Sequence, residues 1–206
     1  MGDAKMVAKI TTVTVGPFAT NCYIIGLSEG QCVVVDPGDD PELILSAIEG
    51  RQALAVLLTH GHFDHVAAAA DVAEMTGAEV WAHVGDRPWL EGQWELWGLR
   101  APRVRYNYFR DDDAPFGIRT IHTPGHSPGS VCYLFDGAVC CGDTIFASSV
   151  GRVDLPGGSE RELVSSLRRL KTELPPESVL LPGHGPATAL ADELRSNPWL
   201  INDPAC

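Results

Sequence analysis

The chain has 206 residues, of which 45% are apolar and 20% charged, a composition typical of globular proteins that excludes a disordered or fibrous chain. Its 15 basic and 27 acidic residues give a formal net charge of −12, which does not suit binding to nucleic acid or to an anionic membrane. The apolar runs are too short to cross a bilayer, and residues 1–10 show no signal peptide. We therefore expect a single domain over residues 1–206, located in the cytoplasm, without nucleic-acid or membrane partners.

The cysteines form no Cys-x-x-Cys pair, and most lie in apolar stretches of strand length. They are Cys22, Cys32, Cys132, Cys140, Cys141 and Cys206. We expect reduced and mostly buried thiols, as in a cytosolic protein, and no zinc site built from four cysteines.

The first part of the chain is predicted to consist of strands joined by turns, because apolar residues alternate with polar ones or form short continuous runs. These strands are expected at residues 7–15, 22–27, 31–36 and 53–59. A helix is predicted to begin at Pro41 and to end at Gly50. The last strand lacks alternation, which indicates that it is covered on both faces.

The rest of the chain combines helices with further strands. A helix over residues 64–76 and a strand over 79–83 are followed by a tryptophan-containing stretch, 85–113, which we expect to be helical in part and then a loop. Further strands are predicted at 117–123, 131–136, 138–142 and 178–181, and further helices at 160–174 and 187–195. The mixture predicts an α+β fold with helices packed outside a sheet.

The string Thr59 to His65 contains four possible metal ligands within six residues. His60 and His62 are two residues apart at a strand end, so their side chains can point to the same side. We expect Gly61, between them, to leave room for a metal ion. Imidazole and carboxylate are usual ligands of Zn²⁺, Fe²⁺ and Mn²⁺, so the string predicts a metal site.

Three more ligand-type residues lie beside glycines, each just after a predicted strand. His126 follows Gly125, Asp143 follows Gly142, and His184 follows Gly183. Functional loops gather at such strand ends in α/β folds, so we expect these three side chains to join the site.

The order Thr-His-x-His-x-Asp-His, followed by isolated His, Asp and His, resembles the metallo-β-lactamase superfamily over essentially the whole chain. The resemblance implies a four-layer αβ/βα sandwich, with two mixed sheets face to face, helices outside, and a metal site along one sheet edge. It also implies two divalent ions, zinc or iron, with manganese possible. The ligands that it implies are His60, His62 and His126 for one ion, Asp64, His65 and His184 for the second, and Asp143 between the two.

Residues 151–159 and 197–200 resemble the short glyoxalase II-like hydrolases of that family, which are similar to hydroxyacylglutathione hydrolase but lack its C-terminal helical domain. The resemblance implies hydrolysis of a small thioester such as S-lactoylglutathione by a metal-bound hydroxide. Asp64 would orient the attacking water or take its proton, in addition to acting as a ligand.

Three other interpretations stay open. Persulfide dioxygenases of the same superfamily use one Fe²⁺ held by two histidines and an aspartate, here His60, His126 and Asp143. Another hydrolase of the superfamily, such as a lactonase or a β-lactamase, is a second alternative. A non-catalytic metal-binding protein is the alternative from another class.

The remaining candidates have weaker signals. Arg152 could bind a substrate carboxylate, or it could pair with Asp154. His83 and His122 are expected at the surface or in support of the ligands. The tryptophan-rich stretch 81–97 is expected to cover a sheet edge or to form a pocket wall, with an oligomer contact as the alternative. The chain is expected to be a monomer or a homodimer.

Overall fold

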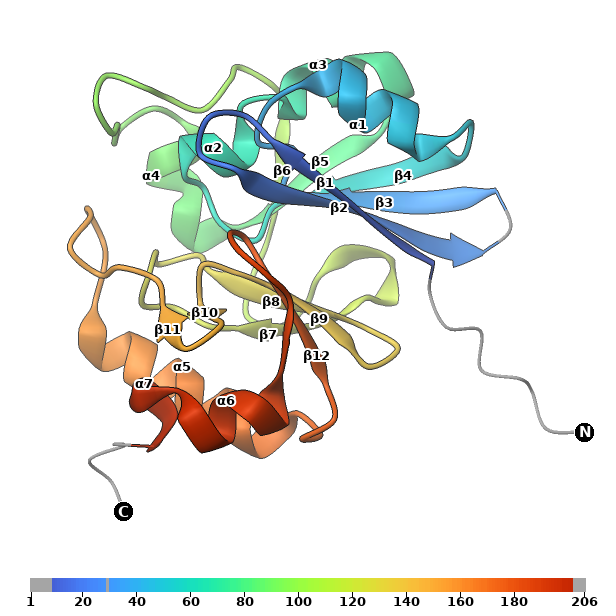
Figure 1. Ribbon diagram of the computed structural model, residues 1–206. Coiled ribbons are helices and arrows are strands. Elements are labelled where there is room, and N and C mark those ends of the chain that lie inside the picture. The colour runs from blue at the N-terminus through green and yellow to red at the C-terminus, as the bar shows by residue number, and fades with distance from the viewer. Residues whose placement is uncertain (1–8, 29, 202–206) are drawn as a thin grey trace, which may run out of the picture.

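The computed structural model describes residues 9–28 and 30–201. Its main strands form two mixed sheets that lie face to face, and helices cover the outer surface of each sheet (Figure 1). This arrangement confirms the predicted four-layer α+β sandwich. Within the described ranges, no helix is both long and apolar enough to span a bilayer.

The first sheet has the strand order β1-β2-β3-β4-β5-β6. Its strands are β1 Ile10–Val15, β2 Thr20–Ser28, β3 Gln31–Val35, β4 Gln52–Leu57, β5 Glu79–His83 and β6 Tyr106–Phe109. The strands β1, β2 and β3 pair antiparallel, whereas β3, β4, β5 and β6 are parallel. The loops that follow the parallel strands therefore leave the sheet at one edge.

The second sheet has the order β13-β12-β9-β8-β7. Its strands are β7 Arg119–His122, β8 Val131–Phe135, β9 Ala138–Gly142, β12 Val179–Pro182 and β13 Thr188–Ala189, and a small separate hairpin is formed by β10 Ile145–Phe146 and β11 Ser149–Val150. Because β8 is antiparallel to both β7 and β9, and β9 is parallel to β12, the carboxyl ends of β7, β9 and β12 lie at one edge.

The helices are short except for α5. They are α1 Pro41–Ile48, α2 Phe63–Val66, α3 Ala69–Thr76, α4 Arg87–Leu90, α5 Glu160–Glu173, α6 Leu190–Ser196 and α7 Pro198–Ile201, with single 3-10 turns η1 Val84–Asp86 and η2 Pro115–Gly117. The helices α1 and α3 cover the first sheet, and α5, α6 and α7 cover the second (Figure 1).

The apolar residues of the central strands alternate between two core layers. In β4, Val56 packs toward α1 and α3, while Ala55 and Leu57 pack toward the second sheet. The strand is therefore covered on both faces, as its unbroken apolar run predicted. The described cysteines are all buried and free, which agrees with the prediction of reduced thiols, and Cys206 lies outside the described residues.

Hydrogen bonds join the two sheets close to the edge where the predicted ligands lie. The Tyr23 hydroxyl donates to the Pro182 carbonyl at 2.7 Å, and the Tyr133 hydroxyl donates to the Leu58 carbonyl at 2.9 Å. Backbone bonds of 2.7 Å and 2.9 Å also link Asn21 N–H to the Gly183 carbonyl and Val131 N–H to the Thr59 carbonyl. The sheets thus meet at a fixed separation there.

Two predicted elements differ from the structure. The helix predicted over 64–76 is divided into α2 and α3, because Ala68 N–H donates to the Pro37 carbonyl at 3.0 Å instead of continuing the first helix. The strand β6 lies in the stretch 85–113, where we predicted a loop. It is a four-residue edge strand that pairs only with β5, so its signal was too short to separate it from the loop around it.

Other boundaries shift by a few residues. The strand predicted over 7–15 is described only from Ile10 onward, and residues 7 and 8 lie outside the described part. The helix predicted over 187–195 begins at Leu190, because Thr188 and Ala189 first pair with β12.

Leu163 in α5 is fully buried, whereas Leu43 in α1 is 55% exposed. Leu163→Ala is expected to lower the free energy of unfolding by about 2–5 kcal/mol, because it removes apolar contacts and leaves a cavity. Leu43→Ala is the matched control and is expected to change this free energy by less than about 1 kcal/mol. Urea denaturation of both variants checks the prediction, and equal effects would contradict it.

Candidate metal centre

The strand ends of both sheets deliver all the predicted ligands to one place. The segment after β4 supplies four of them, and the segments after β7, β9 and β12 supply one each. They are His60, His62, Asp64, His65, His126, Asp143 and His184. Among the described residues, the ligand atoms of His60, His62 and His126 lie within 4.8 Å of one another, and so do those of Asp64, His65 and His184.

The first group consists of three buried histidines. The distance from His126 Nε2 is 2.8 Å to His62 Nδ1 and 3.3 Å to His60 Nε2. Burial, reinforced by the neighbouring imidazoles, lowers the pKa of His60 and His62 well below the usual range, and burial also lowers the pKa of His126. A neutral imidazole carries one N–H and one lone pair, so three such rings can direct their lone pairs toward one cation when their protons are on the other nitrogens.

The second group combines two histidines with a carboxylate. His184 Nε2 lies 3.2 Å from both Asp64 Oδ2 and His65 Nε2. Burial tends to raise the pKa of Asp64, but the hydrogen bond from His184 and the charge of His65 outweigh it and hold this pKa far below its usual range. Asp64 is therefore an anion at neutral pH, with its charge available to a cation.

Asp143 lies between the two groups. Its Oδ1 is 3.4 Å from His65 Nε2, and its Oδ2 is 3.6 Å from His126 Nε2 and 3.7 Å from His184 Nε2. In the part of the chain that the structure describes, Asp143 Oδ1 is buried without a hydrogen-bond partner. A buried, unpartnered carboxylate oxygen facing converging imidazoles fits a bound divalent ion.

Outer partners hold the far nitrogen of most of the histidine ligands, as is usual in metal sites. These Nδ1 contacts are His60 to Thr59 Oγ1 at 3.1 Å, His65 to Asp36 Oδ2 at 2.9 Å, His126 to the Arg152 carbonyl at 2.7 Å, and His184 to the Phe18 carbonyl at 3.0 Å. A carbonyl accepts a hydrogen bond from Nδ1–H of His126 and of His184, which leaves Nε2 of each ring as the nitrogen that would bind a metal ion.

Asp36, which follows β3, is a supporting residue that our sequence analysis did not single out. Its carboxylate accepts hydrogen bonds from Thr59 N–H at 2.7 Å and Thr59 Oγ1 at 2.6 Å, in addition to its contact with His65. It therefore orients the first residue of the ligand string together with one of the ligands. The signal in the sequence was a charged residue directly after the apolar run of β3.

Asp86, in η1, is a second supporting residue that was missed. Its carboxylate accepts three hydrogen bonds of 2.7 Å, from Gly61 N–H, Ser127 Oγ and Gly129 N–H. Burial raises the pKa of Asp86 to about 6 despite these bonds. Asp86 thus ties the loop of His60 and His62 to the loop of His126, and no pattern in the sequence indicated this.

Gly61 has a different role from the predicted one. A Cβ atom at this position would lie 2.9 Å from Trp89 Cβ and 3.1 Å from Asp86 Cβ. The glycine is required because α4 and η1 approach the backbone closely, and not because a metal ion needs the space. The prediction about Gly61 was wrong in this respect.

The other candidates surround the centre. The Arg152 guanidinium donates to both carboxylate oxygens of Asp154, at 2.6 and 2.8 Å, which is the ion pair named as the alternative to substrate binding. His83 and His122 stack with ring centroids 3.9 Å apart. His122 Nε2 donates to the Pro128 carbonyl at 2.9 Å, so this pair supports the loop after His126, as expected.

One part of the tryptophan-rich stretch covers the first ligand group, and another part is exposed at the surface. Trp89 packs edge-on against His62 with centroids 4.5 Å apart, and Trp94 packs against Trp89 at 5.5 Å. Trp97 is 68% exposed. The stretch therefore both shields the first ligand group from water and reaches the surface.

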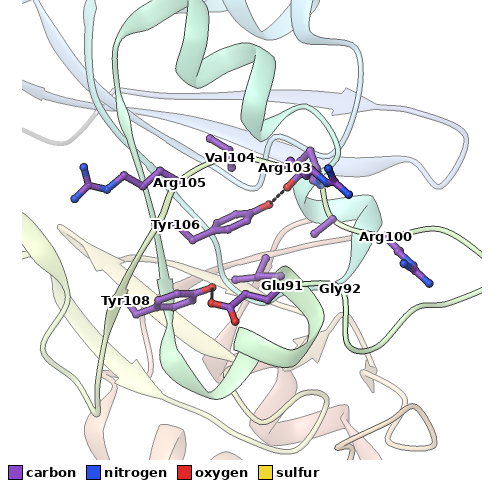
Figure 2. Close-up of a pocket in the computed structure, with 11 residues that line it drawn as sticks. Glu91, Gly92, Arg100, Arg103, Val104, Arg105, Tyr106 and Tyr108 are labelled. Atoms are coloured by element: carbon purple, nitrogen blue, oxygen red, sulfur yellow. Dashed lines mark hydrogen bonds between the residues drawn. The ribbon is translucent and has the colours of Figure 1, made fainter.

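A cavity of about 450 Å³ lies between α4, the following loop and β6 (Figure 2). The Tyr106 hydroxyl donates to the Pro102 carbonyl at 2.7 Å inside it. Figure 2 shows Arg105 extending to the opposite side from Arg100 and Arg103. Because these cations do not converge, the cavity offers no site comparable with the histidine cluster.

Residues 15–184 match the profile of the Metallo-beta-lactamase superfamily. The chain is 36% identical over 200 residues to the probable metallo-hydrolase YqgX of Bacillus subtilis, covering 90% of this chain and 94% of that protein. It is 31% identical over 208 residues to the hydroxyacylglutathione hydrolase GloC of Haemophilus influenzae, covering 93% and 97% respectively.

Solved structures agree with the sequence relatives. The structure of the BLEG-1 B3 metallo-beta-lactamase superposes with a TM-score of 0.86 at 32% identity, covering 94% of this chain and all of that chain (100%). TTHA1623 in a di-iron-bound form superposes with a TM-score of 0.83 at 42% identity, covering 92% and 100%. The fold of this chain thus has close counterparts among solved structures, and one of them was solved in a di-iron-bound form.

The two ligand groups are expected to respond differently to pH. Burial lowers the pKa of His65, but Asp143, Asp36 and Asp64 outweigh it and raise this pKa to about 10. Burial likewise lowers the pKa of His184, but the hydrogen bond to Asp64 and the charge of Asp143 outweigh it and raise this pKa. A metal ion must displace these protons, so affinity at the group of Asp64 should increase at least about tenfold per pH unit from about pH 7 to about pH 9. The metal affinity of the neutral group of His60 should change little over the same pH range.

Competition titration of the metal-free protein with zinc and a chelator of known pH dependence measures both affinities. His65→Ala is expected to remove the zinc-binding step whose affinity depends on pH and to leave the binding step at the group of His60. The same slope for both steps in the unmodified protein would contradict the assignment.

Asp86 is expected to stabilise the metal centre from outside. Asp86→Ala leaves three buried donors without an acceptor, so it should lower the free energy of unfolding by at least about 2 kcal/mol. It should also weaken metal binding by about 10–100-fold. Asp113→Ala, at an exposed position, is the control. Unchanged metal affinity in Asp86→Ala, measured by chelator competition, would refute the role.

Proposed function

Because this chain belongs to the metallo-β-lactamase superfamily, we propose that it is a metal-dependent hydrolase of small thioesters of the S-lactoylglutathione type. The observation that carries the proposal is the pair of ligand groups joined by Asp143, in a chain that is 31% identical to a relative named hydroxyacylglutathione hydrolase. Two divalent ions, zinc or iron with manganese as a further option, agree with the di-iron-bound form of TTHA1623.

Each ligand group would hold one ion, and Asp143 would contact both. When bound, such ions lower the pKa of a coordinated water toward neutrality and polarise a carbonyl group. The first group, His60, His62 and His126, is buried and neutral, so it adds no charge of its own. The carboxylates of Asp64 and Asp143 supply negative charge that offsets the charge of the ions.

Asp64 is the residue to which we assign the direct role in hydrolysis. It remains ionised at neutral pH, and its side chain is 16% exposed, so a water molecule can reach it. An ionised carboxylate accepts a hydrogen bond from the attacking water and holds its oxygen toward the thioester carbonyl. The thiolate departs readily, and the reaction therefore requires little general acid catalysis at the sulfur.

Arg152 is our candidate for binding a substrate carboxylate. Its guanidinium is paired with Asp154, so a substrate anion would have to compete with a bidentate neighbour. We therefore assign Arg152 a smaller part in substrate affinity than the metal ligands have in turnover.

The test is the loss of thioester absorbance from S-lactoylglutathione, with protein reconstituted anaerobically with zinc or with iron. Rapid loss that a chelator abolishes is expected. Asp64→Ala should reduce turnover by at least about 100-fold while the fold persists, because it removes the group that orients the water. Asp71→Ala, at an exposed position in α3, is the matched control.

Full activity in Asp64→Ala would refute the role of that residue. Absence of thioester hydrolysis with either ion, combined with oxygen uptake in the presence of a persulfide, would replace the proposal by a dioxygenase activity at the same ligands.

A further inference from the structure

Three aromatic side chains gather at the surface beside the metal centre. Phe18 is 41% and Trp97 is 68% exposed, and their rings stack with centroids 6.1 Å apart and planes inclined by 13°. Phe63 packs edge-on against both rings, at 5.1 Å from Phe18 and 6.5 Å from Trp97. We call Phe18, Phe63 and Trp97 the aromatic platform.

The platform borders the open side of the metal centre. Phe63 directly precedes Asp64, and the Phe18 carbonyl accepts the hydrogen bond from His184 Nδ1 at 3.0 Å. The side chains of Asp64 and His184 are 16% and 27% exposed, whereas the histidines of the other group are buried. The platform therefore lies beside the ligands that are the most exposed to solvent.

Trp97 occupies an unfavourable backbone position. Trp97 has φ 54° and Gly98 has φ 78°, and Leu96 and Leu99 exchange backbone hydrogen bonds of 3.2 and 2.9 Å around them. A two-residue turn with positive φ at both positions favours asparagine, aspartate or glycine over a bulky aromatic residue. Neither turn preference nor core burial accounts for a tryptophan here, and unfavourable conformations of this kind cluster at ligand sites.

Phe18, Phe63 and Trp97 carry no charge, so the aromatic platform itself offers no ion pair to an anionic substrate group. Arg152 is already paired with Asp154 through two hydrogen bonds. The chain as a whole carries a net charge of −12. The recognition chemistry that the platform offers is instead apolar contact and ring stacking.

We propose that Trp97 is a specificity-determining residue, and that the aromatic platform binds an apolar, ring-bearing substituent of the thioester. The inference rests on the proposed thioesterase activity and adds a substrate class to it. The substituent can be carried on the acyl side or on the thiol side of the thioester, since both adjoin the reacting carbonyl.

Three thioesters without charge separate these possibilities. They are S-acetyl-N-acetylcysteamine, S-phenylacetyl-N-acetylcysteamine and S-benzyl thioacetate, each with its rate normalised to hydrolysis by hydroxide. At least one aromatic compound is expected to exceed the acetyl compound in kcat/KM by about tenfold. Preference for the phenylacetyl compound places the ring on the acyl side, and preference for the benzyl compound places it on the thiol side.

Trp97→Ala is expected to abolish this preference, mainly through KM, and Trp97→Phe is expected to keep most of it. Trp199→Ala removes another exposed tryptophan, in α7, and serves as the matched control that retains the preference. Calorimetric binding of a non-hydrolysable thioether, S-(2-phenylethyl)-N-acetylcysteamine, gives a readout without turnover. This binding should weaken about tenfold in Trp97→Ala.

The outcomes distinguish this inference from the proposed function. If the acetyl compound is hydrolysed without any preference for the aromatic compounds, the proposed binding by the platform is refuted and the thioesterase activity is not. The same holds if the aromatic preference persists in Trp97→Ala. Thioether binding that depends on Trp97, without hydrolysis of any thioester, supports the platform and refutes the thioesterase. The proposal about the platform is also refuted if the protein neither binds the thioether nor hydrolyses any thioester. It is refuted as well if sedimentation shows a dimer that depends on Trp97 and the thioether does not bind.

Discussion

The metal centre depends on the bonds that hold the two sheets together at one edge. Its ligands come from both sheets, so their separation is set by how closely the sheets approach there. The hydroxyls of Tyr23 and Tyr133 each cross from one sheet to a backbone carbonyl of the other, and they do so beside the segments that deliver ligands. Buried hydrogen bonds of this kind are costly to leave unmade, and this cost favours one fixed separation.

The electrostatics of the centre follow from which groups are buried together. Burial lowers the pKa of all three histidines of the first group. Neighbouring imidazoles reinforce this effect at His60 and His62, and at His126 burial outweighs the opposing charge of Asp143. His65 is equally buried but faces carboxylates and keeps its proton. One continuous cluster therefore contains neutral and charged imidazoles side by side. The positions of the aspartates determine which histidines are protonated.

The sequence predicted the ligand string well because its spacing is local. His60 and His62 follow a strand and precede a helix, and those elements are short-range features of the chain. Asp36 and Asp86 were missed because their contacts join residues far apart, such as Asp86 and Gly129. The error about Gly61 has the same origin, since Trp89 and Asp86 determine the space around it. The strand β6 was missed because only pairing with β5 identifies it. Patterns along the chain thus identified the residues that come together at one sheet edge, and tertiary contacts identified the residues that hold them in place.

The buried cysteines influence which metal ions the protein can take up. Cys140 and Cys141 lie three and two residues before Asp143, respectively, and burial raises the pKa of both thiols well above the usual range. Among the described residues, the groups of side chains that could hold a metal ion contain only histidine and aspartate, so these sulfurs take no part in them. The centre therefore presents only nitrogen and oxygen donors, although sulfur lies next to it in the chain. Soft ions such as Cu(I), which seek thiolate, find no such ligand there, and this selection is made by packing inside the second sheet.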